Sequence, residues 1–327
     1  MIISKTPFRM SFTGGGSDLR AYYQTGYGAV VSTTINKFMY VTLNKIFSTR
    51  IRVVYSKAEY VKDVNEVEHN TAREALKLLG TQTAGIDIVY MGDMLPAHEG
   101  SGLGASSSLS VGILNTLHAL KGEQVSADTL AREACQIEIE TLDRPIGKQD
   151  QYAAAYGGLN YIRFTKDESV SVEPITCSQD TKNELTKNLI LLYTGSNTHS
   201  DKILTEQQAR TDNNLPILDK MVGLSEELRK VLLSNDLTEF GNILHEEWLY
   251  KQKLATKITN PIINDYYEKA RKSGAAGGKL LGSGGGGFLL LYCEEKYQNK
   301  VRESLSDLME AHFSFEPEGS RIIYLSD

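Results

Sequence analysis

The chain has 327 residues, of which 41% are hydrophobic and 23% are charged, a balance typical of a globular protein with room for two domains. Its net charge of −6 argues against a nucleic-acid-binding protein, which normally carries a basic excess. The three cysteines are far apart and no stretch reaches the length of a membrane span, which argues against a disulfide framework, a structural zinc site and a membrane protein.

The first half of the chain is predicted to be rich in strands. β-branched and aromatic residues favour early strands over 29–35, 39–46 and 50–55. Apolar residues at helical spacing then favour helices over 68–79, 105–121 and 127–142. Two more strands are expected, at 158–164 and 189–193. Between them lies a charged segment, 165–188, with no strong period, and we place the boundary between domains 1–185 and 186–327 near its end.

The second half is predicted to begin with helices. Their apolar periodicity covers 201–212, 216–234, 237–256 and 261–273. A glycine cluster at 282–287 precedes an apolar strand at 288–293, and a helix at 295–312 and a strand at 321–325 end the chain. Strands mixed with helices in both halves indicate an α/β or α+β protein of two lobes.

The segment 94–112 combines glycines and serines with the start of a predicted helix. Apolar residues recur at spacings of three and four from Leu109 to Leu120, so one face of that helix is expected to be buried. Glycines let backbone N–H groups approach a ligand, and a helix N-terminus adds free donors, so the segment is suited to nucleotide phosphates. It matches neither a Walker loop nor a dinucleotide fingerprint, and a flexible turn before an ordinary helix is the alternative.

Three other islands carry candidate chemistry. Near the N-terminus, Arg9 lies on a predicted strand and Asp18 follows a glycine turn, where it would either accept hydrogen bonds from sugar hydroxyls or cap the turn. Glu138 lies on a predicted helix, where a solvated role is the alternative, and Asp150 follows a glycine turn as a general base or an N-cap. The consecutive glycines of 282–287 indicate close approach to a ligand or another segment, or a simple loop.

In this order the islands resemble the motifs of the GHMP kinases, the superfamily of galacto-, homoserine, mevalonate and phosphomevalonate kinases. The matching segments are Pro7-Phe-Arg9, the phosphate loop Gly102–Ser108 and the glycine-rich turn Leu281–Gly287. The resemblance spans nearly the whole chain. It implies an α+β fold of two lobes, the first like ribosomal protein S5 domain 2 and the second ferredoxin-like, with the active site between them.

The resemblance also implies roles for individual residues. Asp150 would take the proton of the acceptor hydroxyl, and Arg9 would keep Asp150 ionised and stabilise the transferred group. Glu138 and the hydroxyl of Ser106 or Ser107 would hold Mg²⁺ against ATP, and Ala105, where many members carry serine, leaves the choice between the serines open. The implied ATP-binding residues are Gly100, Gly102, Leu103, Gly104, Ala105, Ser106, Ser107, Ser108, Gly284 and Gly285. The implied sugar-binding residues are Gly15, Gly16, Ser17, Asp18 and Lys148.

The segment Thr13-Gly-Gly-Gly-Ser-Asp18 is similar to that of D-glycero-D-manno-heptose 7-phosphate kinases, with fucokinase domains close behind. This implies transfer of the ATP γ-phosphoryl group to the anomeric hydroxyl of the heptose phosphate. The acceptor's own phosphate would need cations, for which the candidates are Arg20, Arg144, Lys148 and Lys202. The alternatives are an anomeric kinase of a free sugar such as L-fucose, a non-catalytic ATP and sugar sensor, and a nucleotide-binding scaffold.

The start of the chain lacks the long apolar run of a signal peptide. We therefore expect a cytoplasmic protein that binds ATP and a sugar or sugar phosphate, without nucleic-acid or membrane partners. The oligomeric state is left open.

Overall fold

The first lobe is built on a sheet in which β1 and β2 are the central pair. The computed structural model describes residues 1–80, 85–94, 101–195 and 200–326. The sheet runs in the order β12-β1-β2-β5-β3-β4, and β6 and β7 extend it from the other end of β2. Its strands are β1 (Ile2–Thr13), β2 (Tyr27–Lys45), β3 (Ile51–Val54), β4 (Ala58–Val61), β5 (Ile86–Gly92), β6 (Leu159–Thr165), β7 (Val170–Pro174) and β12 (Arg321–Leu325).

The predicted strands 29–35 and 39–46 are a single strand, β2, which is 19 residues long. The polar residues Asn36 and Lys37 do not end it, because the register with β1 shifts there: Pro7 faces Phe38 and Phe8 faces Ile35. A bulge of this kind absorbs two unpaired residues and bends the strand. The bend lets β2 pair with β5 at one end and with β6 at the other.

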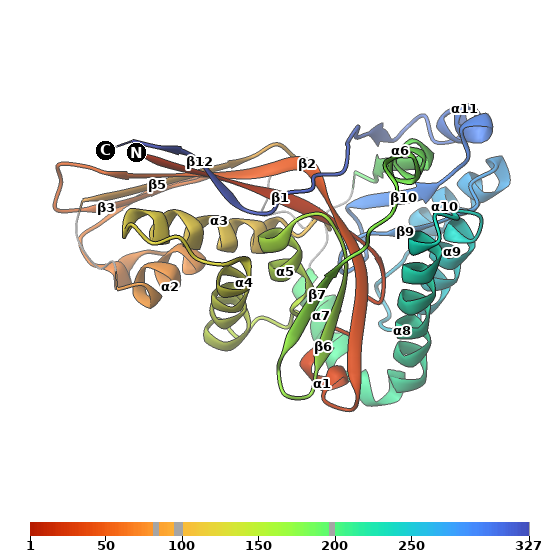
Figure 1. Ribbon diagram of the computed structural model, residues 1–327, viewed down its shortest axis with the longest axis horizontal. Helices are drawn as coiled ribbons and strands as arrows, with labels where there is room; N and C mark the ends of the chain where they lie inside the picture. The colour runs from red at the N-terminus through yellow and green to blue at the C-terminus, as the bar shows by residue number, and fades with distance from the viewer. Residues whose placement is uncertain (81–84, 95–100, 196–199, 327) are drawn as a thin grey trace.

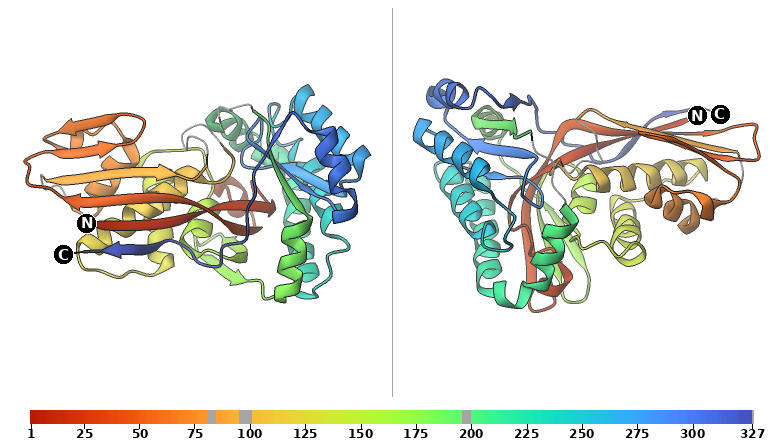
Figure 2. Two further views of the ribbon diagram at one scale, coloured as in Figure 1. Left: turned by 90° about the horizontal axis from the view of Figure 1, so that it is seen from above. Right: turned by 180° about the vertical axis from the view of Figure 1, so that it is seen from behind.

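Helices cover one face of this sheet, below the strands in Figure 1, and the view from above in Figure 2 shows the strands in front of them. Helix α3 has buried residues on nearly all sides, several of them serines, whereas the sequence predicted one buried face. The helices of this lobe are α1 (Arg20–Tyr23), the short 3₁₀ helix η1 (Val64–Glu66), α2 (Asn70–Leu78), α3 (Ala105–Leu120), α4 (Ala127–Cys135) and α5 (Gln149–Tyr156).

The predicted helix 127–142 changes character part of the way along. Helix α4 ends at Cys135, and a π-helix, η2 (Gln136–Thr141), continues it. A π-helix widens the turn by one residue and is often found at functional sites. Here it carries Glu138, which is fully buried.

The second lobe holds a four-stranded antiparallel sheet of order β11-β8-β10-β9. Its strands are β8 (Leu189–Tyr193), β9 (Gly277–Leu280), β10 (Phe288–Tyr292) and β11 (Met309–Glu310). Taken in chain order these are strands 4-1-3-2, with helices after the first and third, which is the ferredoxin-like arrangement that the resemblance implied. The helices are α6 (Gln179–Asn188), α7 (Ser200–Ala209), α8 (Thr211–Leu233), α9 (Phe240–Lys251), α10 (Pro261–Ser273) and α11 (Glu295–Ser304).

The end of the chain departs from the predicted division at 185. After α11, which is shorter than the predicted helix 295–312, the chain adds β11 to the second sheet and then returns to the first lobe. There β12 pairs antiparallel with β1, and both termini lie at the same end of the molecule (Figure 1). The predicted boundary segment 165–188 also holds regular structure, namely β7 and α6.

None of the helices in the described part of the chain combines the length and the apolar character that crossing a membrane requires.

Candidate active site

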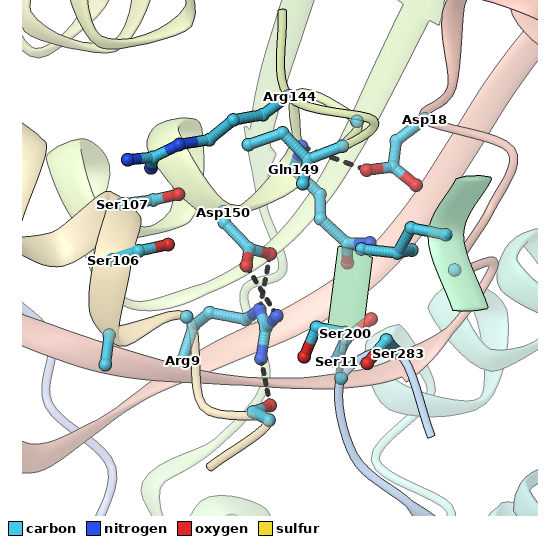
Figure 3. Close-up of a pocket in the computed structure, with 18 of the residues that line it drawn as sticks. Arg9, Ser11, Asp18, Ser106, Ser107, Arg144, Gln149, Asp150, Ser200 and Ser283 are labelled. Atoms are coloured by element: carbon cyan, nitrogen blue, oxygen red, sulfur yellow. Dashed lines mark hydrogen bonds and ion pairs between the residues drawn. The ribbon is translucent and has the colours of Figure 1, made fainter. Parts of the chain in front are cut away.

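A pocket of about 450 Å³ lies where the two lobes meet (Figure 3). The first lobe contributes residues of β1, the start of α3 and the loop before α5, and the second contributes residues of α7, α9 and the glycine-rich turn. Residues at the start of α2 and on β5 line it too, among them His69, Asn70, Thr71 and Tyr90. Segments far apart in the sequence therefore share one cavity.

Arg9 and Asp150 form a two-bond ion pair in this pocket. The Nε and Nη2 atoms of Arg9 donate to the two carboxylate oxygens of Asp150, each at 2.6 Å. Nη1 of Arg9 donates to the carbonyl of Gly102 at 2.5 Å, so the guanidinium also holds the phosphate loop. Arg9 is 5% exposed and Asp150 is 23% exposed. The carboxylate is thus fixed in orientation but still accessible from the pocket.

The phosphate loop places its glycines where a side chain would not fit. Gly102 and Gly104 have φ of +79° and +73°, a region that favours glycine, and α3 begins at Ala105. All three line the pocket. Leu103 is buried, and its carbonyl accepts the backbone N–H of Arg9 at 3.0 Å. Gly100, also predicted to bind ATP, lies outside the described residues.

The three serines of the loop point in different directions. Ser106 is exposed and lines the pocket, and Ser107 is buried with its hydroxyl donating to Glu138 at 2.7 Å. The hydroxyl of Ser108 donates to the carbonyl of Pro7 at 2.9 Å. Ser108 therefore joins α3 to β1, and its side chain is not among those that line the pocket.

Gly102→Ala is expected to raise the KM for ATP by about tenfold or more, because small displacements of binding groups are costly. The added Cβ would lie 2.6 Å from the carbonyl oxygen of Leu281, on the glycine-rich turn. Gly122→Ala is the matched control, since Gly122 has φ of +75° and open space around it. Both variants are expected to lose roughly 1–2 kcal/mol of unfolding free energy from the left-handed conformation. Equal KM values for ATP in the two variants would contradict a role of the loop in nucleotide binding.

Glu138, on the π-helix, lies behind the pocket lining and contacts two of the residues that form it, Ser107 and Arg144. Its carboxylate accepts hydrogen bonds from Ser107 and Gln151, both at 2.7 Å, and from Arg144 at 2.6 Å. Burial raises the pKa of the Glu138 carboxyl, against the lowering effect of these three partners. The alternative of a solvated helix residue therefore does not hold for Glu138, whose carboxylate is buried and has three hydrogen-bond donors.

The oxygens of Glu138 and Ser107 fit a magnesium ion shared with a nucleotide. Both are hard oxygen donors and they lie side by side. Across the described part of the chain, no cluster of three or more His, Cys, Asp or Glu side chains forms a metal site of its own. A magnesium ion here would therefore take its remaining ligands from phosphate oxygens and water.

On the other side of the Arg9–Asp150 pair, the glycine turn after β1 places Asp18 at the pocket. Gly15, Gly16 and Asp18 all line it. The Asp18 carboxylate accepts the backbone N–H of Gly16 at 2.9 Å and that of Gln149 at 3.3 Å, so it also caps the turn. Ser17 is fully buried, and its hydroxyl donates to backbone carbonyls of the first lobe. Of these four residues, which the sequence predicted to bind a sugar, Asp18 is the one that brings a side-chain carboxylate to the pocket lining.

The stability of the protein is expected to depend on pH through Asp18. Burial, followed by the negative charge of Asp150, raises the pKa of Asp18 above 3.8. The folded state therefore holds the proton more tightly than the unfolded state, and the unfolding free energy falls as pH rises from 3.8 through the raised pKa. Asp18→Asn removes this titration, so its unfolding free energy is expected to fall less over the same interval. Urea titrations at several pH values measure it, and equal slopes would contradict the assignment.

Three of the four cations predicted for the acceptor phosphate lie away from the pocket lining. Lys148 donates to the carboxylate of Glu168 at 2.5 Å, and Arg20 pairs with the same carboxylate at 3.0 Å. Lys202 is exposed on α7. Only Arg144 of this set lines the pocket. Lys148, predicted to bind the substrate, is thus engaged with β6 and β7 through the turn that joins them.

The glycine-rich turn closes the pocket with residues other than those predicted. Gly282 and Ser283 line the pocket, whereas the predicted Gly284 and Gly285 are not among the lining residues. The backbone N–H of Gly285 donates to the carbonyl of Ile258 at 2.7 Å, and a Cβ on Gly284 would lie 2.8 Å from Ile258. These two glycines let the turn pack against the segment after α9.

The sequence analysis missed a group of buried charges behind the pocket. Lys251 and Lys279 both line it, and Lys279 pairs with Glu247 at 3.1 Å. Glu247 also accepts the backbone N–H of Gly14 at 3.0 Å, so the pair joins the second lobe to the glycine turn of the first. One signal was available: Glu247 and Lys251 flank Trp248 on the apolar side of α9, where charged residues are rare.

Comparison with known proteins identifies the family. A model described as the N-terminal domain of the GHMP kinases matches residues 59–158, and one described as their C-terminal domain matches residues 225–311. Two lobes that meet at a phosphate loop of this type define a GHMP kinase fold. The two models together match more than half of the 327 residues, and the chain belongs to the GHMP kinases.

Two heptose phosphate kinases are among the proteins that align over nearly the whole chain. A D-glycero-alpha-D-manno-heptose 7-phosphate kinase of Campylobacter jejuni is 26% identical over 336 residues, which cover 97% of each chain. The crystal structure of a D-glycero-D-manno-heptose 1-phosphate kinase from Bacteroides thetaiotaomicron has a TM-score of 0.81 and 26% identity, with 100% of both chains covered. The bifunctional fucokinase/GDP-fucose pyrophosphorylase of Arabidopsis thaliana is 26% identical over 178 residues, 52% of this chain and 16% of that protein.

Proposed function

We propose that this chain is an ATP-dependent sugar kinase whose acceptor is a heptose phosphate. The observation that carries the proposal is the Arg9–Asp150 ion pair, which lies in the pocket beside the N-terminus of α3. Phosphoryl transfer to a hydroxyl requires a positioned base and groups that neutralise the transferred phosphoryl, with little other chemistry. The pair and the helix N-terminus supply both.

In the proposed reaction the acceptor hydroxyl oxygen bonds to the γ-phosphorus of ATP. The bond from that phosphorus to the oxygen bridging the β- and γ-phosphates breaks, and ADP leaves with its electron pair. The hydroxyl proton passes to one of the two carboxylate oxygens of Asp150. Each oxygen accepts one hydrogen bond from Arg9 and keeps a further lone pair that can take the proton. Arg9 orients the carboxylate through two bonds and holds Gly102 of the phosphate loop through a third.

We assign Ser107 and Glu138 as the residues that would hold Mg²⁺, with Ser106 facing the phosphates directly. This assignment rests on the contact between the Ser107 hydroxyl and Glu138, and on the exposed position of Ser106 at the pocket. When bound, the ion would neutralise phosphate charge.

The acceptor class rests on the two heptose phosphate kinases that align with the whole chain. Their names place the acceptor phosphate at different carbons. We propose the 7-phosphate as acceptor and its anomeric hydroxyl as the site of transfer, which gives the 1,7-bisphosphate and ADP. Asp18, on the far side of Gln149 from Asp150 (Figure 3), would then accept hydrogen bonds from the sugar hydroxyls.

A free sugar such as L-fucose is the second candidate acceptor. Two observations favour it: the partial match to a plant fucokinase, and the position of Arg20, Lys148 and Lys202 outside the pocket lining. A free sugar needs no cation for a second phosphate. The rest of the mechanism would be unchanged.

Release of ADP from Mg-ATP with a panel of acceptors tests the proposal. The panel is the heptose 7-phosphate, the heptose 1-phosphate, free heptose, mannose, L-fucose and galactose. We expect turnover with the 7-phosphate and little with the free sugars. Preference for L-fucose would move the chain to the second candidate, and absence of turnover with every acceptor would support a non-catalytic sensor.

A further inference from the structure

Lys251, the last residue of α9, is a buried lysine at the wall of the pocket. It is 6% exposed, and its Nζ donates to the carbonyl of Leu280 at 2.9 Å and to that of Gly282. An ammonium has three N–H donors, so one remains beyond these two bonds. Because Lys251 lines the same pocket as Arg9 and Asp150, that donor is available to a ligand there.

Lys251 differs from its buried neighbour Lys279 in having no carboxylate partner. Lys279 pairs with Glu247 at 3.1 Å. Within the described ranges, no carboxylate oxygen lies within 4.0 Å of the Nζ of Lys251. Burial, followed by the positive charge of Lys279, lowers the pKa of Lys251 well below its ordinary value. The charged form of Lys251 is therefore costly by itself and would be favoured by an anion beside it, so a lysine at this place in a pocket points to an anionic ligand.

The position of Lys251 indicates which anion this is. Lys251 donates to the carbonyl of Gly282, and Gly282 packs against Gly102. The contact is so close that a Cβ on Gly282 would lie 2.4 Å from the Cα of Gly102. Gly102 in turn accepts a hydrogen bond from Arg9. Lys251 therefore lies where the glycine-rich turn meets the phosphate loop.

Figure 3 shows how this place relates to the predicted metal site. Ser106 and Ser107 lie on one side of the Arg9–Asp150 pair, and Ser283, the residue after Gly282, lies on the other. Lys251, which holds the carbonyl of Gly282 next to Ser283, thus approaches the pocket from the second lobe, whereas Ser107 and its partner Glu138 belong to the first.

We propose that Lys251 is a catalytic residue that donates its third N–H to an oxygen of the phosphoryl group in transfer, an inference that rests on the proposed kinase function. In that step the bond to the acceptor oxygen forms as the bond to the leaving ADP oxygen breaks, and charge spreads over three equatorial oxygens. Arg9 and a magnesium ion at Glu138 would neutralise part of this charge. Lys251 adds a donor from the second lobe, so both lobes contribute to the site.

Lys251→Met is the variant that tests this role. We expect kcat to fall about 10²-fold or more, with little change in the KM for ATP, because the contact forms as charge develops. A binding measurement is the second readout: calorimetric titration of MgADP with aluminium fluoride and acceptor, which mimics the transferred group, compared with MgADP alone. The variant is expected to lose the gain in affinity that aluminium fluoride gives the unaltered protein. Lys251→Arg, which keeps the charge, is expected to restore part of both.

Lys253→Met is the matched control, since Lys253 is exposed two residues further along and packs over Tyr250. It is expected to match the unaltered protein in both measurements. An unchanged kcat in Lys251→Met would overturn this inference and leave the proposed function standing. Weaker binding of MgADP itself would also overturn it, by assigning Lys251 to the shape of the glycine-rich turn. A higher KM for the phosphorylated acceptor with kcat unchanged would overturn it by assigning Lys251 to the acceptor's own phosphate. Absence of turnover by the unaltered protein would overturn the proposed function and this inference together.

Discussion

Asp150→Asn is expected to lower kcat by about 10²–10⁴-fold, the usual contribution of a positioned base. Asparagine has nearly the same shape and keeps one oxygen to accept a bond from Arg9, but it cannot take the proton of the acceptor hydroxyl. Affinity for ATP is expected to stay nearly unchanged, because the hydrogen bonds that hold the phosphate loop come from Arg9. Single-turnover ADP formation and calorimetric ATP binding measure the two effects separately.

A control for Asp150→Asn is available in the loop before α5. Asp143 is exposed and has φ of +48°, a conformation that asparagine tolerates well, so Asp143→Asn changes the same chemical group away from the pocket. Because Asp150→Asn leaves the buried Arg9 with a weaker counter-charge, thermal unfolding of both variants is needed to verify that they are folded. Turnover near that of the unaltered protein in a folded Asp150→Asn would remove Asp150 from the role of base.

The helices and strands that were predicted well are those in which the spacing of apolar side chains follows the period of the helix or strand. The apolar spacing of 105–121 predicted α3, and the apolar run of 288–293 predicted β10. Strand β9 was not predicted, because Gly277 and Gly278 have no side chains to show alternation and the strand depends on pairing with β10. Likewise the sequence predicted a strand at 321–325 but not its partner, since pairing with β1 joins residues at opposite ends of the chain.

The candidate site was predicted in part for a related reason. The resemblance to the family motifs predicted that Arg9 and Asp150, which are 141 positions apart in the sequence, lie side by side, and the structure shows that contact. The direction of a long side chain is not encoded in a motif, and Lys148 pairs with Glu168 although it lies two residues from Asp150. The sequence places Lys251 on the apolar side of α9, but the partners of its Nζ, which belong to the glycine-rich turn, follow only from the packing of the second lobe.

Glu138→Gln is expected to raise the Mg²⁺ concentration needed for half-maximal turnover by about tenfold or more, a cost typical of a weakened metal site. The amide removes the negative charge that would attract the ion, while it can still accept from Ser107. Its ion-pair partner, Arg144, is 23% exposed, so solvent offsets part of the lost ion pair and the variant is expected to fold.

Glu140→Gln tests whether this effect belongs to the buried position. Glu140 lies on the same π-helix as Glu138 but is exposed, so the same substitution there is expected to leave the Mg²⁺ requirement unchanged. ATP binding measured by calorimetry with and without Mg²⁺ gives a readout independent of turnover: the ion is expected to strengthen binding less in Glu138→Gln than in Glu140→Gln. Equal strengthening in both would show that the ion is held by the nucleotide phosphates and Ser107 without Glu138, and the carboxylate would then serve to orient Arg144 and α3.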